Sequence, residues 1–378
     1  MKEDFSSRTI ASIRGPEILD VLPDGAYITD CERKIVFWSK SAERILGWTA
    51  AEVVGRNCSD NILVHVDKDG HELCGKEYCP LHRSIITGAP SDEPLLVYAK
   101  HRSGTRIPVE VSVAPIRADD GQVVGGIELF RDLSELESDL KRAREIQITL
   151  LESSLPADPR LGFDIRYTPD SVIGGDFYRI ERLDDQRYVI MIADVMGHGV
   201  ASALYTVLLR QIWEDSRALL PYPADFATAL NSRLGKLAAD SGYFATAICL
   251  LLNAATGRIQ YVRAGHPAPI LMHDQGAAPL PDDGQPALAM LPDITYTEAQ
   301  AVMHPGDTLV LYTDGATETC NIEGQDLGTE GLASILASLP AGNSDFPAMN
   351  QVEESILRYS GSLRLTDDLT LIAITRRH

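Results

Sequence analysis

At residues 188–204 the chain reads YVIMIADVMGHGVASAL, and at residues 172–180 it reads VIGGDFYRI. The first stretch has the pattern of a buried apolar strand that runs into a Gly-His-Gly turn and then a helix. The second stretch has two glycines, which let the backbone turn tightly before a strand begins. Asp194 ends the apolar run of the first stretch, and Asp176 follows the glycines of the second. Both stretches therefore predict a carboxylate at the end of a β-strand.

Two later stretches repeat this arrangement. Asp314 follows the apolar run in DTLVLYTDGATE, and Asp367 and Asp368 open DDLTL at the start of the last strand. Any one of these aspartates alone is readily explained as a turn or cap residue, because Asp-Gly is a common turn pair. Four such positions, if they converge, need a cation, since buried carboxylates repel one another. Carboxylate oxygens favour Mg²⁺ or Mn²⁺. The pattern predicts a two-metal site that holds a phosphoryl group and activates a water for attack.

The motifs GGDFY, ADVMGHG, AGHPAP, LYTDG and DDLTL, in this order, resemble the PPM/PP2C phosphatases. More narrowly, they resemble the bacterial stress-response and sporulation branch of that family. The resemblance implies an α-β-β-α sandwich over residues 157–378 and a metal-dependent protein-serine/threonine phosphatase. The implied substrate is phosphoserine or phosphothreonine on a partner protein, an anti-sigma-factor antagonist of the STAS type.

The resemblance also implies roles for the motif residues. Two ions, Mn²⁺ or Mg²⁺, would be held by carboxylates and one backbone carbonyl: Asp176, Asp194 and Val195 at the first, and Asp314, Asp367 and its neighbour Asp368 at the second. The catalytic residues would be Asp176, Asp194, Asp314 and His198. His198 either protonates the leaving serine oxygen or shapes its turn. The backbone would approach the metals and phosphate closely at Gly175, Gly197 and Gly199. His266 is expected to orient its loop through a hydrogen bond.

The N-terminal part has a different pattern. Two strand-like runs, several short helices and a three-stranded meander are expected between residues 21 and 132, after a helix over residues 1–20. DGAYITD, FWSKSAERILGW, EVVGRN and the exit DLSELE resemble a PAS sensor domain. The expected fold class is therefore α+β, with an antiparallel PAS sheet, a helical linker and the sandwich. The ligand of the sensor is unknown, and a sensor without a cofactor is preferred.

Cysteines and histidines in the sensor permit other interpretations. The segment between His65 and His82 includes Cys74 and Cys79, whose Cys-x4-Cys spacing would allow zinc, iron or a redox pair. That spacing lies outside the tightest zinc signatures, so a structural role is favoured. Cys58 in GRNC lacks the following residues that flavin-binding PAS domains use. Flavin photochemistry is therefore not expected.

Between the two domains, apolar positions step by three and four residues along a predicted helix over residues 133–156. The stripe consists of Leu133, Leu136, Leu140, Ala143, Gln147 and Leu150. This spacing is typical of a coiled-coil seam, although it covers only about three heptads. The preferred interpretation is a coiled-coil linker that forms a parallel homodimer and passes a signal to the strand of Asp176, because a helix between two domains has few other places to bury this stripe. The other is a single amphipathic helix packed on its own domain.

Composition narrows the class of protein. The net charge of −20 argues against nucleic acid or an anionic membrane as the main partner. No signal peptide or spanning segment is recognised, and six scattered cysteines suggest a reducing cytoplasm. Two other functions were weighed: a degenerate phosphatase that only binds partners, and a PAS-linked nucleotide cyclase. The intact aspartates speak against the first, and the absence of a Gly-Gly-Asp-Glu-Phe motif speaks against the second.

Overall fold

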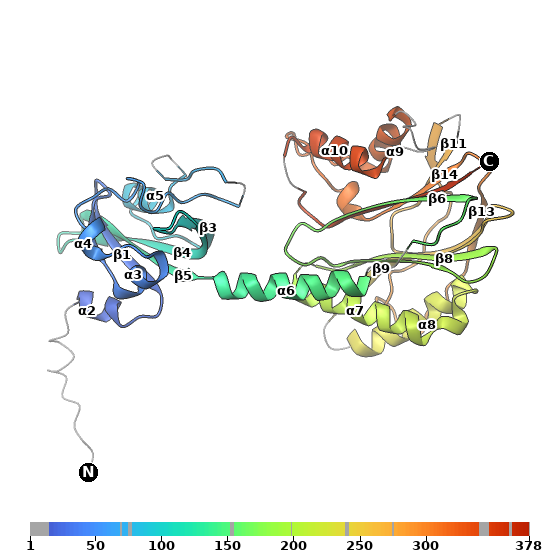
Figure 1. Ribbon diagram of the computed structural model, residues 1–378, viewed down its shortest axis with the longest axis horizontal. Helices are drawn as coiled ribbons and strands as arrows, with labels where there is room; N and C mark the ends of the chain where they lie inside the picture. The colour runs from blue at the N-terminus through green and yellow to red at the C-terminus, as the bar shows by residue number, and fades with distance from the viewer. Residues whose placement is uncertain are drawn as a thin grey trace, which may run out of the picture. The chain divides into compact units, whose positions relative to one another are not determined.

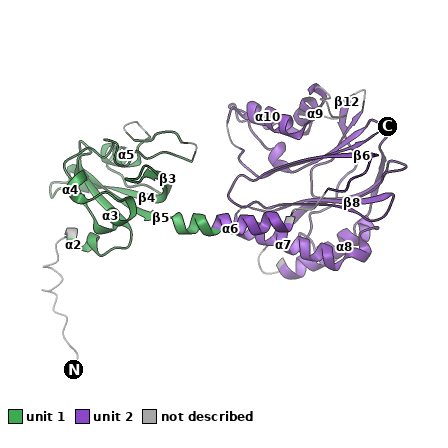
Figure 2. Cartoon of the chain, in the orientation of Figure 1, with its two compact units in different colours: residues 1–139 green, residues 140–378 purple. Residues whose placement is uncertain are grey.

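The chain divides into two compact units, residues 1–139 and 140–378 (Figure 2). The computed structural model describes residues 15–68, 70–74, 78–151, 155–197, 199–238, 242–273, 276–339, 348–362 and 365–377. The helix expected over residues 1–20 is described only in its last part, as α2 (Gly15–Asp20). His198, the predicted proton donor, lies outside the described residues. No helix within the described ranges combines the length and the apolar character needed to cross a lipid bilayer.

The first unit contains an antiparallel sheet with the strand order β2-β1-β5-β4-β3. Its strands are β1 (Gly25–Asp30), β2 (Ile35–Trp38), β3 (Leu95–Lys100), β4 (Arg106–Arg117) and β5 (Val123–Asp132). Its further helices are α3 (Lys40–Leu46), α4 (Ala50–Val53) and α5 (Pro80–Thr87). This order of two strands, short helices and a meander confirms the pattern expected from the sequence. Helix α3 ends at Gly47, whose φ of 75° suits a residue without a Cβ.

The second unit contains two sheets. The strands of the first, in the order β13-β10-β9-β8-β7, are β7 (Asp176–Arg182), β8 (Arg187–Val195), β9 (Ala245–Asn253), β10 (Arg258–Ala264) and β13 (Ala299–Val302). The strands of the second, in the order β12-β11-β14-β15-β6, are β6 (Leu161–Thr168), β11 (Ile270–His273), β12 (Gly276–Pro279), β14 (Thr308–Tyr312) and β15 (Leu369–Arg376). The helices are α7 (Val200–Asp215), α8 (Pro223–Ala238), α9 (Gly328–Ser338) and α10 (Met349–Ser360), with 3₁₀ turns η1 (Arg217–Leu219) and η2 (Asp314–Ala316).

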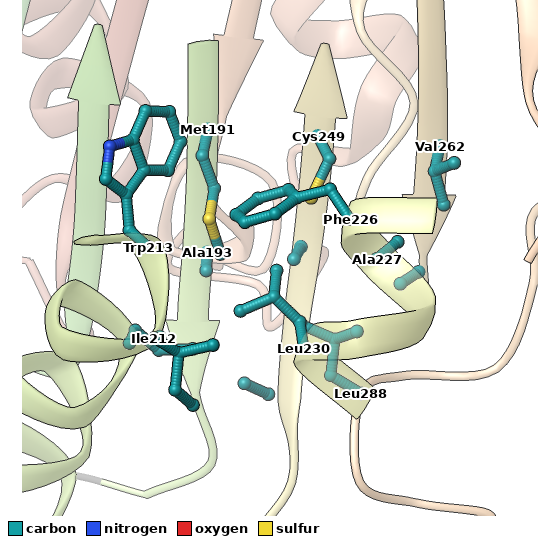
Figure 3. Close-up of a cluster of buried hydrophobic side chains, with 14 of the residues drawn as sticks. Met191, Ala193, Ile212, Trp213, Phe226, Ala227, Leu230, Cys249, Val262 and Leu288 are labelled. Carbon is teal, nitrogen blue, oxygen red and sulfur yellow. The ribbon is translucent and has the colours of Figure 1, made fainter. Parts of the chain in front are cut away.

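Helices cover the outer faces of the two sheets, α7 and α8 on one side and α9 and α10 on the other (Figure 1). Strand β8 shows why its sequence is almost entirely apolar. Met191 and Ala193 face α7 and α8, among Trp213 and Phe226 (Figure 3). Ile192, which points the opposite way, packs between the two sheets. Both faces of the strand are therefore buried, and the predicted α-β-β-α layering is confirmed.

Helix α6 (Ser134–Leu151) begins in the first unit and ends in the second. Gln147, expected in a coiled-coil seam, is instead buried in its own unit. Its amide nitrogen donates to the carbonyl of Gly174 at 2.7 Å and to the hydroxyl of Thr206 at 3.1 Å. The Arg210 guanidinium also donates to the carbonyl of Leu150. The end of α6 is thus a helix packed on its own unit, and pairing with a second copy stays a prediction.

Candidate active site

Asp176 and Asp194 face each other at one end of the β7–β8 pair. They are register partners in this antiparallel pair, where Asp176 begins β7 and Asp194 lies one residue before the end of β8. Partners in such a pair project to the same side of the sheet. Asp194 lies two residues after Ile192 in β8, and side chains at this spacing project to the same face of a strand. Asp194 therefore lies on the side that faces the second sheet. The sequence motifs therefore bring two carboxylates together between the sheets.

The second sheet binds Asp176 directly. Its Oδ2 accepts hydrogen bonds from the hydroxyls of Thr313 at 2.9 Å and Thr370 at 2.6 Å. Thr313 follows β14 and Thr370 lies in β15, so this carboxylate connects the ends of both sheets. The other oxygen, Oδ1, is buried without a hydrogen-bond partner in the described structure. Burial raises the pKa of Asp176 well above its ordinary value, and the charge of Asp194 adds to the rise.

Asp314 stands at the start of η2, directly after Thr313. Burial raises the pKa of Asp194 to about 8, and the charges of Asp314 and Asp367 contribute further. Burial also raises the pKa of Asp314 to about 6, together with the charges of Asp367 and Glu318. These mutual effects place the predicted carboxylates in one electrostatic cluster. The sequence reading missed Glu318, although it follows Asp314 by four residues in the same motif.

Asp367 and Asp368 have different surroundings. The side chain of Asp368 is 5% exposed, and its two oxygens accept the backbone N–H groups of Asp170 at 2.9 Å and Gly175 at 2.5 Å. Asp368 therefore clamps the loop before β7. Asp367 is exposed, and one of its oxygens accepts the N–H of Asp368 at 2.8 Å. Of this pair, Asp367 keeps more of its oxygen lone pairs available for a ligand.

The glycines of this region leave little room for side chains. A Cβ on Gly174 would lie 2.4 Å from the Tyr167 hydroxyl, and one on Gly175 would lie 3.1 Å from the carbonyl oxygen of Val195. The backbone of Gly175 thus lies close to the Val195 carbonyl, and its approach to metals and phosphate stays a prediction. Gly197 and Gly199 have φ values of 84° and 87°, which favour glycine. The positive φ angles of this turn therefore explain why both positions are glycine, with no need to invoke a bound ligand.

His266 has a supporting position, as expected. Its Nδ1 lies 2.7 Å from the hydroxyl of Thr246, the register partner of Asp194 in β9. Burial lowers the pKa of His266 to about 3, so the ring is neutral. Arg263 donates to the His266 carbonyl at 3.2 Å and forms an ion pair with Asp282. These contacts hold the AGHPAP loop against β9, the strand that pairs with the Asp194 strand β8.

Comparison with known proteins identifies both parts of the chain. The family model described as Stage II sporulation protein E (SpoIIE) matches residues 184–377, and a PAS domain model matches residues 23–135. The chain belongs to the SpoIIE family. The match to the SpoIIE model begins after Asp176, so the GGDFY motif and α6 lie outside it.

Relatives of the SpoIIE-family chain include two proteins of Bacillus subtilis (strain 168). Phosphoserine phosphatase RsbP is 32% identical over 183 residues, which cover 48% of this chain and 45% of RsbP. Phosphoserine phosphatase RsbU is 24% identical over 309 residues, which cover 81% of this chain and 88% of RsbU. The chain thus spans less than half the length of RsbP. The SiaA-PP2C domain of Pseudomonas aeruginosa shares the fold, with a TM-score of 0.55, 22% identity and coverage of 64% of this chain and 97% of that domain.

The donor set of this SpoIIE-family site fits divalent cations. Asp176 Oδ1 is a buried carboxylate oxygen without a partner, and neighbouring carboxylates raise one another's pKa values. Both features indicate a position for positive charge. Across the described residues, however, no group of three or more His, Cys, Asp or Glu side chains has the arrangement of a ready-made metal site. The carboxylates are gathered but not preformed around an ion.

The sensor unit contains a separate polar cluster. Cys58, Cys74 and Cys79 are buried free thiols, and the Cys74 sulfur accepts the backbone N–H of His65 at 3.0 Å. His65 Nε2 lies 3.6 Å from Glu128 Oε1, and both side chains are buried. Burial lowers the pKa of His65 to about 4 and raises that of Glu128 to about 8. Burial also raises the pKa of each of these thiols, which makes them poor nucleophiles.

Proposed function

We propose that the chain is a PAS-regulated, metal-dependent phosphoprotein phosphatase that hydrolyses phosphoserine or phosphothreonine. The observation that carries this proposal is the gathering of Asp176, Asp194, Asp314 and Asp367 at one end of the sandwich. RsbP and RsbU, which are named phosphoserine phosphatases, support the same activity. We further propose residues 157–378 as the catalytic domain, residues 21–132 as the sensor and residues 133–156 as the linker.

In this proposal the carboxylates have distinct roles. Asp176 and Asp194, with the carbonyl of Val195, would hold one Mn²⁺ or Mg²⁺, and Asp314 and Asp367 would hold the other. When bound, the two ions neutralise phosphoryl oxygens and lower the pKa of a water that attacks phosphorus. Thr313 and Thr370 keep the carboxylate of Asp176 in place through their hydroxyls. Asp368 keeps the Gly174–Gly175 turn in place through backbone N–H groups.

The partner would be a small phosphorylated protein, and we propose an anti-sigma-factor antagonist of the STAS type. This choice follows the resemblance of the sequence motifs to the stress-response and sporulation branch of the PPM/PP2C phosphatases. The alternative of a partner-binding scaffold without activity is disfavoured, because every predicted carboxylate ligand is present.

The activity is tested by incubating the full chain with phosphoserine, phosphothreonine and phosphotyrosine peptides. Phosphate release is expected from the first two in Mn²⁺ or Mg²⁺, and chelation by EDTA should reduce it to background. Adding excess Mn²⁺ after EDTA should restore it. Release that persists in EDTA would contradict the metal-dependent mechanism, and no release from any peptide or phosphoprotein would support the scaffold.

Gln147 is expected to link α6 to the site. Replacing Gln147 with Ala leaves the Gly174 carbonyl buried without its donor, two residues before Asp176. We expect kcat/KM to fall about 10-fold, since losing one buried hydrogen bond costs about 1–3 kcal/mol. Ile146→Ala on the exposed side of the same helix is the matched control. Phosphatase kinetics check this. Equal activity of the Gln147 and Ile146 variants would show that α6 does not support the turn.

A further inference from the structure

Several large apolar side chains are exposed beside the candidate active site. Met196 directly follows Val195, whose carbonyl is a predicted metal ligand, and is 39% exposed. Val200 and Leu204, in the first two turns of α7, are 50% and 61% exposed. Residues four apart lie on the same side of a helix, so these two side chains form one exposed apolar face. Exposed apolar side chains that gather in one place mark an interaction surface.

A loop far along the chain reaches the same end of the first sheet. Ala245 is the register partner of Val195, and it exchanges two backbone hydrogen bonds with Leu288, at 3.0 and 2.8 Å. Neighbouring strands lie about 4.8 Å apart, which places Leu288 roughly 10 Å from Val195. Met290 and Leu291, which follow in the same loop, are 50% and 48% exposed. This loop therefore adds two exposed apolar side chains to the surroundings of the metal-ligand turn.

The loop is held in a strained conformation. Ala289 has a φ of 66°, in the left-handed region that a residue with a Cβ rarely adopts. Asn231 of α8 is buried and accepts the backbone N–H of Ala289 at 2.8 Å. The amide of Asn231 also donates to the carbonyl of Leu291 at 3.1 Å. Such strain persists only where the surrounding structure fixes it. Met290 and Leu291 are thus presented by a clamped loop.

Two tyrosines join the α7 face to the start of β9. Tyr205, the neighbour of Leu204, stacks on Tyr243 with ring centroids 4.8 Å apart and an interplanar angle of 22°. Tyr243 precedes Phe244, whose carbonyl accepts the backbone N–H of Met196 at 3.0 Å. The α7 face, the Met196 turn and the clamped loop therefore surround one end of β9. Together their exposed apolar residues form a rim patch, which consists of Met196, Val200, Leu204, Met290 and Leu291.

We propose that the rim patch is the docking surface for the phosphorylated partner protein. This inference rests on the proposed function and names the surface that recognises its substrate. A phosphoserine on a folded protein reaches the carboxylate cluster only if the surface of that protein comes to lie against the residues around Val195. The cores of protein interfaces are apolar and rich in methionine, as the rim patch is. The partner should therefore carry an apolar surface around its phosphorylated residue.

Two other occupants fit the rim patch less well. An anionic lipid surface would be repelled by the net charge of −20. A second copy of the chain carries the same charge, and a copy seated on the rim patch would cover the turn of Val195. The approach of any phosphoprotein to the carboxylates would then be blocked. A partner that arrives with its phosphoserine has no such conflict.

Kinetics of the full chain with a large and a small substrate test the docking surface. The large substrate is a serine-phosphorylated STAS-type antagonist, and the small one is p-nitrophenyl phosphate, which has no protein surface. In Leu204→Ala and in Met290→Ala/Leu291→Ala, kcat/KM for the phosphoprotein is expected to fall about 10-fold, as for truncation of central interface residues. Turnover of p-nitrophenyl phosphate should be unchanged. Val302→Ala is the matched control, because this side chain is 45% exposed at the opposite end of the first sheet.

The other outcomes distinguish this proposal from the proposed function. Unchanged turnover of the phosphoprotein in the rim-patch variants would overturn the docking surface while the proposed function stands. An equal loss with both substrates would also overturn it, because the patch would then support the catalytic turn. A change of oligomeric state, measured by light scattering, would assign the patch to a second copy instead. If the wild type hydrolyses neither substrate, isothermal titration calorimetry with the phosphoprotein decides. Binding that the variants weaken would support the docking surface and refute the proposed function, and no binding would overturn both.

Discussion

Asp194→Asn is expected to lower kcat/KM for a phosphoserine peptide at least about 100-fold, because even outer-shell changes at metal sites cost about 10–100-fold. Asn has nearly the shape of Asp but lacks the negative charge that a divalent cation requires. Asp194 also belongs to the carboxylate cluster, since burial and then the charges of Asp314 and Asp367 raise its pKa. The measurement is steady-state phosphatase kinetics across a range of Mn²⁺ concentrations. Activity restored by high Mn²⁺ would identify weakened metal binding as the cause.

In the metal-free protein, Asp194→Asn is expected to increase the stability of the fold, although it lowers the activity of the metal-loaded enzyme. Burial, together with the charges of Asp314 and Asp367, raises the pKa of Asp194 to about 8 in the fold, from an ordinary value of 3.8. Between these values the folded state holds the proton more tightly, so this group makes stability fall as pH rises. Asn carries no such proton, so the stability of the variant relative to the wild type should rise from pH about 4 to pH about 8 and stay constant above that. Thermal unfolding in EDTA at pH 6 and pH 9 measures this difference.

Asp185→Asn is the matched control, because that carboxylate is fully exposed in the β7–β8 hairpin and pairs only with Arg182 at 3.0 Å. It removes the same charge from the turn that joins the same two strands. Wild-type kinetics are expected for this variant. If Asp194→Asn retained comparable activity, the assignment of Asp194 as a metal ligand would be wrong.

Trp213→Ala is expected to destabilise the second unit by about 3–5 kcal/mol, the usual cost of deleting a large buried aromatic side chain. Trp213 is fully buried between α7 and the first sheet, and Phe226 meets its ring edge-on with centroids 5.5 Å apart (Figure 3). Its Nε1 also donates to Glu181 Oε2 at 3.2 Å. The substitution therefore leaves a cavity and an acceptor without its donor. Urea unfolding followed by far-UV circular dichroism measures the loss.

Two companion variants separate packing from other effects. Trp213→Phe keeps part of the ring volume and should cost clearly less than the alanine variant. Tyr222→Ala removes an exposed aromatic side chain nearby and should change stability by less than about 0.5 kcal/mol. Equal losses from Trp213→Ala and Tyr222→Ala would show that the α7–sheet interface does not limit the stability of this unit.

Much of the site could be predicted because strand ends are visible in the sequence. Asp194 directly follows an apolar run, and Asp314 follows one after a single threonine; such runs require burial on both faces. The glycines of GGDFY and MGHG mark close backbone approach or positive φ. The predicted layering came from the family resemblance. The order of strands within each sheet did not, because neighbouring strands such as β15 and β6 are far apart in the chain.

Other features depended on contacts between distant residues. A stripe at three- and four-residue spacing fits a coiled coil and a helix packed on its own domain equally well. At the end of α6, the contacts of Gln147 show a helix packed on its own domain, because its amide donates to the carbonyl of Gly174 and the hydroxyl of Thr206. Nothing in the local sequence around residue 147 specifies those two partners.

The amino-acid sequence by itself determined that carboxylates end several buried strands, because an apolar run and the turn that stops it are local properties. Only the tertiary structure decided which oxygens remain available for a ligand. Asp368 is occupied by the N–H groups of Asp170 and Gly175, and Asp176 is held by Thr313 and Thr370. The physical reason is that the hydrogen-bond donors around a buried carboxylate determine which of its oxygens stay available. These donors come from strands that meet only when the two sheets pack together.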